Sequence, residues 1–334
     1  YWKAGDAGAA ELVSGATRGM PSGLTVSDNY EPRFSEDGKQ LFLGTAPPPA
    51  APAAEGARQP MRVDLWNYKD PLLQPMQQVR ATQERNRNYR AVVHLADKRF
   101  VQLATPDLPN VNQGTDTARA IGTSDLPYRQ FVSWDQSYND VYLVDLKTGA
   151  SRKVLERMSQ PASMSPAGKF LLYYDEEKGH WFSHRIADGL RTNLTERIGA
   201  SFRQESHDTP DLPGSYGSGG WTADDRAVVL YDRYDIWEVR PDGTGARMLT
   251  NGEGRAKHIT FRYRSLDPEQ RTVPATGTLL LSATNEDTRA SGYARVAATG
   301  GAPEPLIMID KAVGAPTKAK HADVVVFTQS RFEE

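Results

Sequence analysis

The sequence contains no cysteine, which excludes disulfide bonds, thiolate metal sites and cysteine nucleophiles. It also lacks any run approaching the roughly 18 apolar residues that a membrane-spanning helix needs. Neither sign of charge is in large excess, since 40 basic and 42 acidic residues leave a net charge of -2. Without a basic field to attract phosphate groups, the composition argues against a protein that binds nucleic acid or an anionic membrane.

The 334 residues are 38% hydrophobic and 25% charged, which is typical of a folded chain that buries a sizeable core. One unit, from Gly219 to Thr250, predicts four short strands separated by tight turns. The turns are marked by proline, aspartate and glycine, because proline presets φ and glycine accepts a positive φ. The predicted strands surround the turns at 223–226, 232–234 and 241–245.

The same four-strand pattern recurs along the chain. Its apolar second strands begin at Phe170, Ala227, Thr278 and Val324, which are spaced 57, 51 and 46 residues apart. A period of about 40–50 residues with four strands per unit is typical of β-propeller blades. A β-sandwich has no reason to repeat one four-strand pattern five times, so we predict an all-β propeller of four-stranded antiparallel blades.

The chain holds about six blades' worth of sequence, with half-blades at both termini. The predicted boundaries are a half-blade at 1–13, blades at about 30–105, 118–157, 161–198, 218–252 and 258–308, and a half-blade at 321–334. The two halves could join into one shared blade that closes a ring. Because both ends fall inside a blade and Tyr1 follows no Met or signal peptide, we favour a piece of a longer polypeptide.

Two segments interrupt the pattern. Residues 47–60 are almost entirely proline and alanine, which predicts an extended insertion between strands. Residues 72–88 place Leu73, Met76 and Val79 at helical spacing, which predicts a short helix. That helix is either a partner-docking arm or a solvated insertion, and the sequence favours the insertion.

Catalytic motifs are missing. No G-x-S-x-G nucleophile elbow occurs, and the nearest look-alike, 214–220, has the wrong spacing. His180 and His184 stand four residues apart in a predicted strand, which separates their rings by roughly 13 Å, too far to share a metal. No glycine-rich phosphate loop is present. We therefore predict no catalytic residue, no metal site and no cofactor in this chain.

Two polar clusters are the candidates for binding. The first is the inter-blade segment 204–211, and the second is the predicted hairpin 231–235. Loops of this kind lie at an end of a propeller, where ligands and partners bind. The residues selected as substrate or interdomain contacts are His207, Asp208, Asp211, Arg233 and Asp235. Loop capping and strand-edge ion pairing are the alternative roles, and the sequence favours them.

Four stretches carry a resemblance to a known family. They are 64–77 (DLWNYKDPLLQPMQ), 89–95 (YRAVVHL), 207–211 (HDTPD) and 220–237, which begins GWTADD and ends YDRYDIW. With them, the chain from about residue 30 onward resembles the propeller region of bacterial prolyl-oligopeptidase-type (S9) serine peptidases. The blade pattern alone is shared with TolB-like and other propellers.

The resemblance implies a two-part enzyme. A propeller covers a C-terminal α/β-hydrolase domain with a Ser-Asp-His triad and restricts entry to peptides that can reach the cavity. No triad residue can be assigned to this chain. Exopeptidase relatives hold the substrate's amino terminus with paired glutamates in a helical insertion of the propeller. Glu176 and Glu177 fall in a predicted strand–strand hairpin instead, so that role is not transferred.

Three functions remain open at this point. In the first, the chain is the gating and docking propeller of an S9 peptidase. The partners of this propeller would be the hydrolase domain of the same polypeptide and peptide substrates. Alternatively, it is a free-standing TolB-like propeller that binds a partner protein, or an enzyme with its own site in the central channel. The first is favoured. For its location, the bacterial periplasm or secretion is favoured over the cytoplasm.

Overall fold

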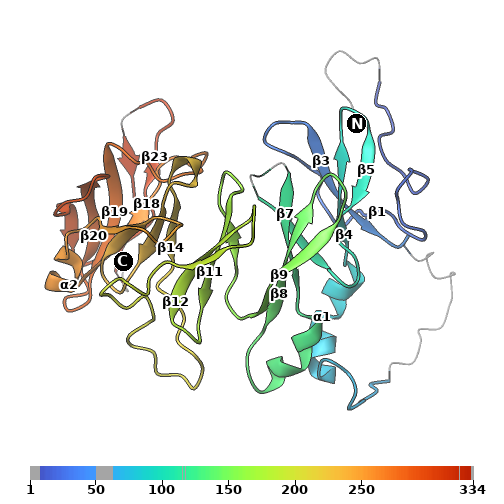
Figure 1. Ribbon diagram of the computed structural model, residues 1–334, viewed down its shortest axis with the longest axis horizontal. Helices are drawn as coiled ribbons and strands as arrows, with labels where there is room; N and C mark the ends of the chain where they lie inside the picture. The colour runs from blue at the N-terminus through green and yellow to red at the C-terminus, as the bar shows by residue number, and fades with distance from the viewer. Residues whose placement is uncertain (1–7, 50–62, 115, 117, 323, 332–334) are drawn as a thin grey trace. The chain divides into compact units, whose positions relative to one another are not determined.

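The computed structural model describes residues 8–49, 63–114, 116, 118–322 and 324–331. It divides into two compact units, Tyr1–Ser159 and Gln160–Glu334. Strands dominate both units, and each unit is built from antiparallel sheets (Figure 1). The predicted all-β class with repeated four-stranded sheets is therefore confirmed.

The first unit contains two sheets. One has strands β1 (Thr25–Val26), β2 (Arg33–Phe34), β3 (Gln40–Ala46), β4 (Tyr89–His94) and β5 (Arg99–Gln102), with β1 and β2 both pairing with β3. The other has strands β6 (Asn110–Gln113), β7 (Arg119–Ser124), β8 (Asn139–Asp145) and β9 (Ser151–Met158) in chain order.

The second unit contains three four-stranded sheets, each also in chain order. Sheet C has β10 (Ser163–Met164), β11 (Phe170–Asp175), β12 (His180–Arg185) and β13 (Arg191–Asn193). Sheet E has β14 (Ser218–Trp221), β15 (Val228–Tyr231), β16 (Ile236–Val239) and β17 (Ala246–Met248). Sheet G has β18 (Ile259–Arg264), β19 (Thr278–Asn285), β20 (Ser291–Ala297) and β21 (Glu304–Ile309).

A bent hairpin follows sheet G. Its outer part pairs β22 (Ala312–Val313) with β25 (Gln329–Ser330), and its inner part pairs β23 (Thr317–Lys318) with β24 (Val325–Val326). Here it is named the terminal hairpin. At the other end of the chain, residues 1–7 lie outside the described residues, and 8–13 contain no strand.

Helices occur only in connections within the described residues. Helix α1 (Gln74–Arg85) lies within the stretch 72–88, in the connection from β3 to β4, and has no buried residue. Most of the proline–alanine insertion, from residue 50 onward, lies outside the described residues. The other helices are η1 (Leu126–Ser133), η2 (Ala223–Asp225) and α2 (Glu253–Lys257).

Apolar residues on alternate strand positions form cores between neighbouring sheets. Between sheets C and E, one cluster joins Leu172 and Trp181 to Trp221 and Val228. Between sheets E and G, another joins Val229 and Ile236 to residues such as Phe261, Leu279 and Leu281. Within the second unit, sheet E therefore buries one face against sheet C and the other against sheet G.

The antiparallel order determines where the connections lie. In a four-stranded antiparallel sheet, the turn from the second to the third strand lies at the same end as the connection leaving the fourth strand. In the second unit, this end collects the hairpins 176–179, 232–235 and 286–290 and the inter-sheet connections 194–217 and 249–258. We name it the connection end.

Candidate functional site

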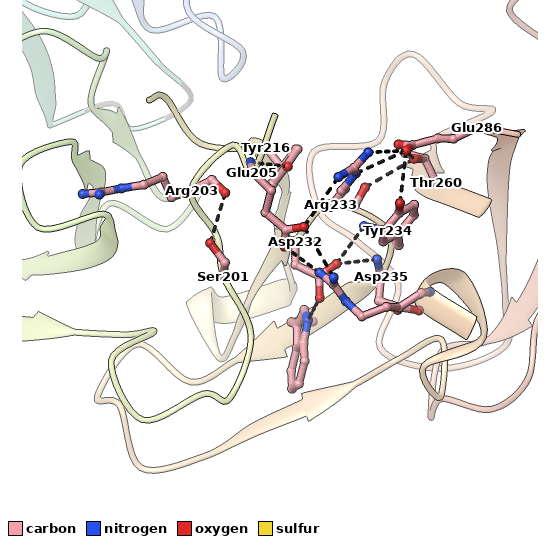
Figure 2. A network of polar contacts seen from close by, with 12 residues as sticks. Ser201, Arg203, Glu205, Tyr216, Asp232, Arg233, Tyr234, Asp235, Thr260 and Glu286 are labelled. Carbon is pink, nitrogen blue, oxygen red and sulfur yellow. Dashed lines mark hydrogen bonds and ion pairs between the residues drawn. The ribbon is translucent and has the colours of Figure 1, made fainter. Parts of the chain in front are cut away.

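The two polar clusters selected from the sequence meet at the connection end of the second unit (Figure 2). Arg233, in the β15–β16 hairpin, places its Nη1 3.7 Å from Oε2 of Glu205, in the connection between sheets C and E. Hydrogen bonding also holds Glu205, because its backbone N–H donates to the Tyr216 hydroxyl at 2.6 Å. The contact joins a connection and a hairpin that belong to successive repeats.

Arg255 supplies a second cation to the same carboxylate. It lies in α2, and its Nη2 is 2.7 Å from Oε1 of Glu205. The hydrogen bond from Arg255 to Glu205 raises the pKa of the guanidinium. Glu205 is thus shared between two arginines from two different connections.

Glu286 is the second acidic partner of Arg233, besides Glu205. Its Oε2 is 2.7 Å from Arg233 Nη2, and it also accepts hydrogen bonds from the Tyr234 hydroxyl at 3.1 Å and the Thr260 hydroxyl at 3.2 Å. The hydrogen bond with Arg233 lowers the pKa of Glu286 and raises that of Arg233. Glu205, Arg233, Arg255 and Glu286 are called the charge network below.

Tyr234 forms the floor of this network. The Cζ atoms of Arg233 and Arg255 lie 5.1 and 5.2 Å from its ring centroid, within the range of cation–π attraction. The ring also stacks on His258 at 5.8 Å, and His258 Nδ1 is 2.9 Å from Asp287. The aromatic floor restricts the rotamers of both arginines, so the network is preorganised.

Two aspartates of the hairpin have structural roles. Asp232 is buried and accepts hydrogen bonds from the N–H groups of Tyr234 and Asp235 and from the Trp237 indole, at 2.7–2.9 Å. Asp235 is fully buried, and its carboxylate accepts from the Thr250 hydroxyl at 2.6 Å and from the N–H groups of Gly254 and Arg255 at 3.0 Å. Asp235 therefore positions α2, and with it Arg255, from inside the fold.

The remaining sequence candidates form a local cluster of their own. His207 Nε2 lies 2.9 Å from a carboxylate oxygen of Asp211, and Thr209 donates to Asp211. That hydrogen bond from Thr209 lowers the pKa of Asp211. Asp208 is exposed beside them. This cluster adjoins Glu205 in the sequence, but no contact between the described residues joins His207 or Asp211 to Arg233.

The glutamate pair lies in the β11–β12 hairpin, as the sequence predicted. Glu176 is buried and accepts a hydrogen bond from the Gln160 amide at 2.5 Å, whereas Glu177 is exposed. Arg203 binds the two backbone carbonyls of the pair, at 2.9 and 3.1 Å. The two side chains thus have different surroundings.

Sequence reasoning missed three members of the charge network. Glu205 lay inside a selected cluster but was not itself selected, and Arg255 and Glu286 were not considered. The repeat pattern could have indicated Glu286. This residue begins the turn between β19 and β20, which are the second and third strands of sheet G, and the β15–β16 hairpin that holds Arg233 is the equivalent turn of sheet E.

The network alternates cations and carboxylates, and such a surface suits recognition of charged groups on a partner. Among the described residues, no group of three or more His, Asp or Glu side chains is arranged to hold a metal ion. No helix in the described part of the chain has the length and hydropathy needed to cross a membrane.

Comparison with known proteins gives structural neighbours only. No protein-family model matches the chain, and no curated protein matches it. The similar solved structures include prolyl-oligopeptidase-type peptidases and TolB-like propellers at low sequence identity.

Three examples illustrate the similarity. The β-propeller domain of the Trilobed protease from Pyrococcus furiosus is 13% identical with a TM-score of 0.41, over 90% of this chain and 78% of that one. Dipeptidyl peptidase 4 from Porphyromonas gingivalis is 13% identical with a TM-score of 0.45, over 83% and 36%. A putative TolB from Agrobacterium tumefaciens is 16% identical with a TM-score of 0.39, over 84% and 80%.

The chain thus spans about a third of the dipeptidyl peptidase chain, compared with most of the propeller domain and of the putative TolB. At these identities and TM-scores, the likeness does not assign the chain to a family.

Proposed function

We propose that this chain is the non-catalytic propeller region of an S9-type serine peptidase, which gates peptide access and docks on a C-terminal α/β-hydrolase domain. The four resembling sequence stretches support the proposal. So does the repetition of four-stranded sheets, which builds a scaffold and leaves specificity to the connections. A periplasmic or secreted location is part of the proposal.

The observation that carries the proposal is the charge network. Its four side chains come from four separate connections of three sheets, so the fold brings charged side chains that are far apart in the sequence together at the connection end. Of the five residues selected from the sequence, His207, Asp208, Asp211 and Arg233 remain contact candidates. Asp235 is buried and acts through Arg255.

The first unit adds a candidate docking element in its own second-to-third-strand connection. Leu65, Trp66 and Tyr68 have 69–89% of their surfaces exposed. Gln78 and Gln77 of α1 bind Asp64 and Asp70 at 2.9 and 3.1 Å, which ties this segment to the helix. Three large apolar side chains that are exposed within the short stretch 65–68 favour a partner-docking arm over a solvated insertion.

The test uses the full-length product of the reading frame that contains this chain. We expect it to hydrolyse a chromogenic peptide and to react with a fluorophosphonate probe, whereas the isolated 334-residue chain should do neither. Trp66→Ser in the full-length protein should lower kcat/KM about tenfold through loss of docking. Trp134→Ser, an equally exposed tryptophan at 69%, is the matched control and should leave kcat/KM unchanged.

A full-length product without a hydrolase domain or probe labelling would overturn this proposal. It would favour the second candidate, a free-standing TolB-like propeller that binds a partner protein. The alternating arginines and glutamates of the charge network suit that function too. Turnover by the isolated chain would contradict both and indicate an enzyme with its own site.

A further inference from the structure

A cavity of about 270 Å³ lies between α2 and sheet G, on the side of the sheet that faces sheet E. Its whole lining comes from residues 253–308, so one connection and one complete four-stranded sheet form it. Phe261 and Ala294, which line the cavity, also belong to the core that sheet G shares with sheet E. Its apolar wall includes Ile259, Phe261, Ala283, Ala294, Pro305 and Met308.

Helix α2 is held in place at the mouth of this cavity. The backbone N–H groups of Gly254 and Arg255 donate to the buried Asp235 carboxylate, both at 3.0 Å. A Cβ atom on Gly254 would lie 2.8 Å from the carbonyl oxygens of Tyr234 and Ile259, so the helix backbone already packs as closely as glycine allows. The cavity is therefore preformed, which reduces the cost of ordering the site when a ligand binds.

The size and the polarity of the cavity limit what it can hold. An apolar cavity of about 150 Å³ stays dry and binds benzene. At about 270 Å³, this cavity has room for an aromatic ring or a branched aliphatic chain together with the carbon that carries it. Because its wall is mostly apolar, water finds few hydrogen-bond partners there, and an apolar group replaces water favourably.

The mouth of the cavity carries one pair of opposite charges. Oε2 of Glu253 is 2.6 Å from Nζ of Lys257, and both residues line the cavity from successive turns of α2. Their side chains are 27% and 63% exposed, so the pair lies where the cavity meets solvent. A few polar groups at the edge of an apolar pocket fix the orientation of a ligand.

We propose that this cavity binds a free α-amino acid with a large apolar side chain. The side chain occupies the apolar interior, the ligand carboxylate pairs with Lys257, and the ligand ammonium pairs with Glu253. The two charges of an α-amino acid lie on neighbouring groups, as those of the ion pair do, so both are matched at once. The cavity lies within the second unit, and it is present whether or not the chain belongs to a peptidase.

Other ligand classes match only part of the site. A hydrocarbon would fill the interior and leave both charges at the mouth without a ligand partner. A fatty acid or the carboxyl terminus of a peptide supplies an anion for Lys257 but no cation for Glu253. The amino terminus of a peptide supplies the cation alone. A free amino acid satisfies the apolar interior and both charges.

The test titrates the whole 334-residue chain with L-phenylalanine, followed by isothermal titration calorimetry. We expect saturable binding with a Kd on the order of 1 mM, because the ligand has few atoms. L-Phenylalaninamide lacks the carboxylate and N-acetyl-L-phenylalanine lacks the ammonium, so each should bind at least about tenfold more weakly. Glycine has no apolar side chain and should not bind detectably.

Lys257→Gln should weaken binding of L-phenylalanine about tenfold, because the ligand carboxylate loses its cation. Lys178→Gln is the matched control. Lys178 is 64% exposed and pairs with Asp175 at 2.7 Å within the same kind of short-range contact, but it does not line the cavity. This variant should bind L-phenylalanine normally.

Ala283→Leu should abolish binding, because the larger side chain fills the interior of the cavity. Circular dichroism checks that this variant is folded, and Lys257→Gln gives an independent test at an exposed position. Absence of saturable binding, equal binding of L-phenylalaninamide, or unchanged binding by Lys257→Gln would overturn the proposal. Toluene binding as tightly as L-phenylalanine would overturn it in favour of a purely apolar ligand.

Discussion

The carboxylate of Asp225 accepts a hydrogen bond from the Ser165 hydroxyl at 2.6 Å, across the boundary between sheets E and C. Both side chains are buried. The same carboxylate accepts from the N–H groups of Ala167 and Lys169, at 3.0 and 3.2 Å. One side chain from the turn that enters β15 thus satisfies three donors of the turn that enters β11.

Replacing Asp225 with alanine should destabilise the second unit by about 2–4 kcal/mol, because the buried Ser165 hydroxyl loses its acceptor and the part-buried N–H groups of Ala167 and Lys169 lose their bonds to the carboxylate. Urea unfolding followed by tryptophan fluorescence measures the change. Asp37→Ala is the matched control. The Asp37 carboxylate accepts similar hydrogen bonds from Ser35 and Lys39 in the turn before β3. Because Asp37 is exposed, its replacement should shift the urea midpoint little. Equal effects of the two substitutions would show that the sheet-to-sheet contact adds nothing.

Gly292 lies where the backbones of β20 and β21 approach too closely for a side chain. A Cβ atom there would be 1.9 Å from the carbonyl oxygen of Ile307. Gly292→Ala should therefore force the strands apart and cost about 3 kcal/mol. Gly199→Ala, where a Cβ meets nothing within 4 Å, should leave stability nearly unchanged. Thermal melts of the two variants compare them directly, and a Gly292→Ala protein as stable as wild type would contradict the close approach.

The charge network predicts a pH dependence in acid. The hydrogen bond with Arg233 lowers the pKa of Glu286 below its ordinary value of 4.5. The unfolded chain therefore takes up this proton first as the pH falls, and stability from the ionised Glu286 is lost from about pH 4.5 downward. Above that range, the contribution is fully present.

Glu286→Gln should therefore lower the urea midpoint at pH 7, and its difference from wild type should shrink as the pH falls below 4.5. Glu304→Gln is the control. The Glu304 pKa is also lowered by its arginine partner, Arg295, but the pair is exposed and screened by solvent. A Glu286→Gln difference that stays constant from pH 7 to 3.5 would contradict the ion pair.

Tyr128 predicts a second pH dependence, in base. Its hydroxyl donates to the buried Asp140 at 2.6 Å, and burial together with this hydrogen bond raises its pKa from 10.0 to about 12. In the unfolded chain, the phenol deprotonates near pH 10, so its stabilising contribution is lost between about pH 10 and 12. Below pH 10, it is fully present.

Tyr128→Phe should lower the free energy of unfolding at pH 8 by about 1–2 kcal/mol, because Asp140 loses a charge-assisted hydrogen bond. The difference from wild type should decrease between pH 10 and 12. Tyr68→Phe, at a tyrosine 89% exposed, should behave like wild type throughout. An unchanged Tyr128→Phe difference up to pH 12 would show that the phenol does not titrate as predicted.

Local sequence patterns predicted the strands well where turn chemistry and alternation agree. The stretch 170–174 corresponds to β11, 227–231 to β15 and 278–281 to the start of β19. Gly243 has φ of +70° in the turn predicted for 241–245. These features depend on neighbours within a few residues, so one sequence is sufficient to find them.

The candidate site was only partly predictable. Arg233 was selected, but its partner Glu286 lies 53 residues away and Glu205 lies 28 residues away on the other side. Asp235 reads as an exposed hairpin residue in the sequence. In the structure it is fully buried, because α2 folds back over the hairpin and presents its backbone N–H groups to the carboxylate.

The sequence by itself determined the repeated four-strand unit, since apolar alternation and turn residues act locally and the same arrangement recurs. Tertiary structure alone decided which charged side chains meet. Pairing of Glu205, Arg233 and Glu286 depends on how successive sheets stack. This is a long-range relationship, and no local pattern encodes it.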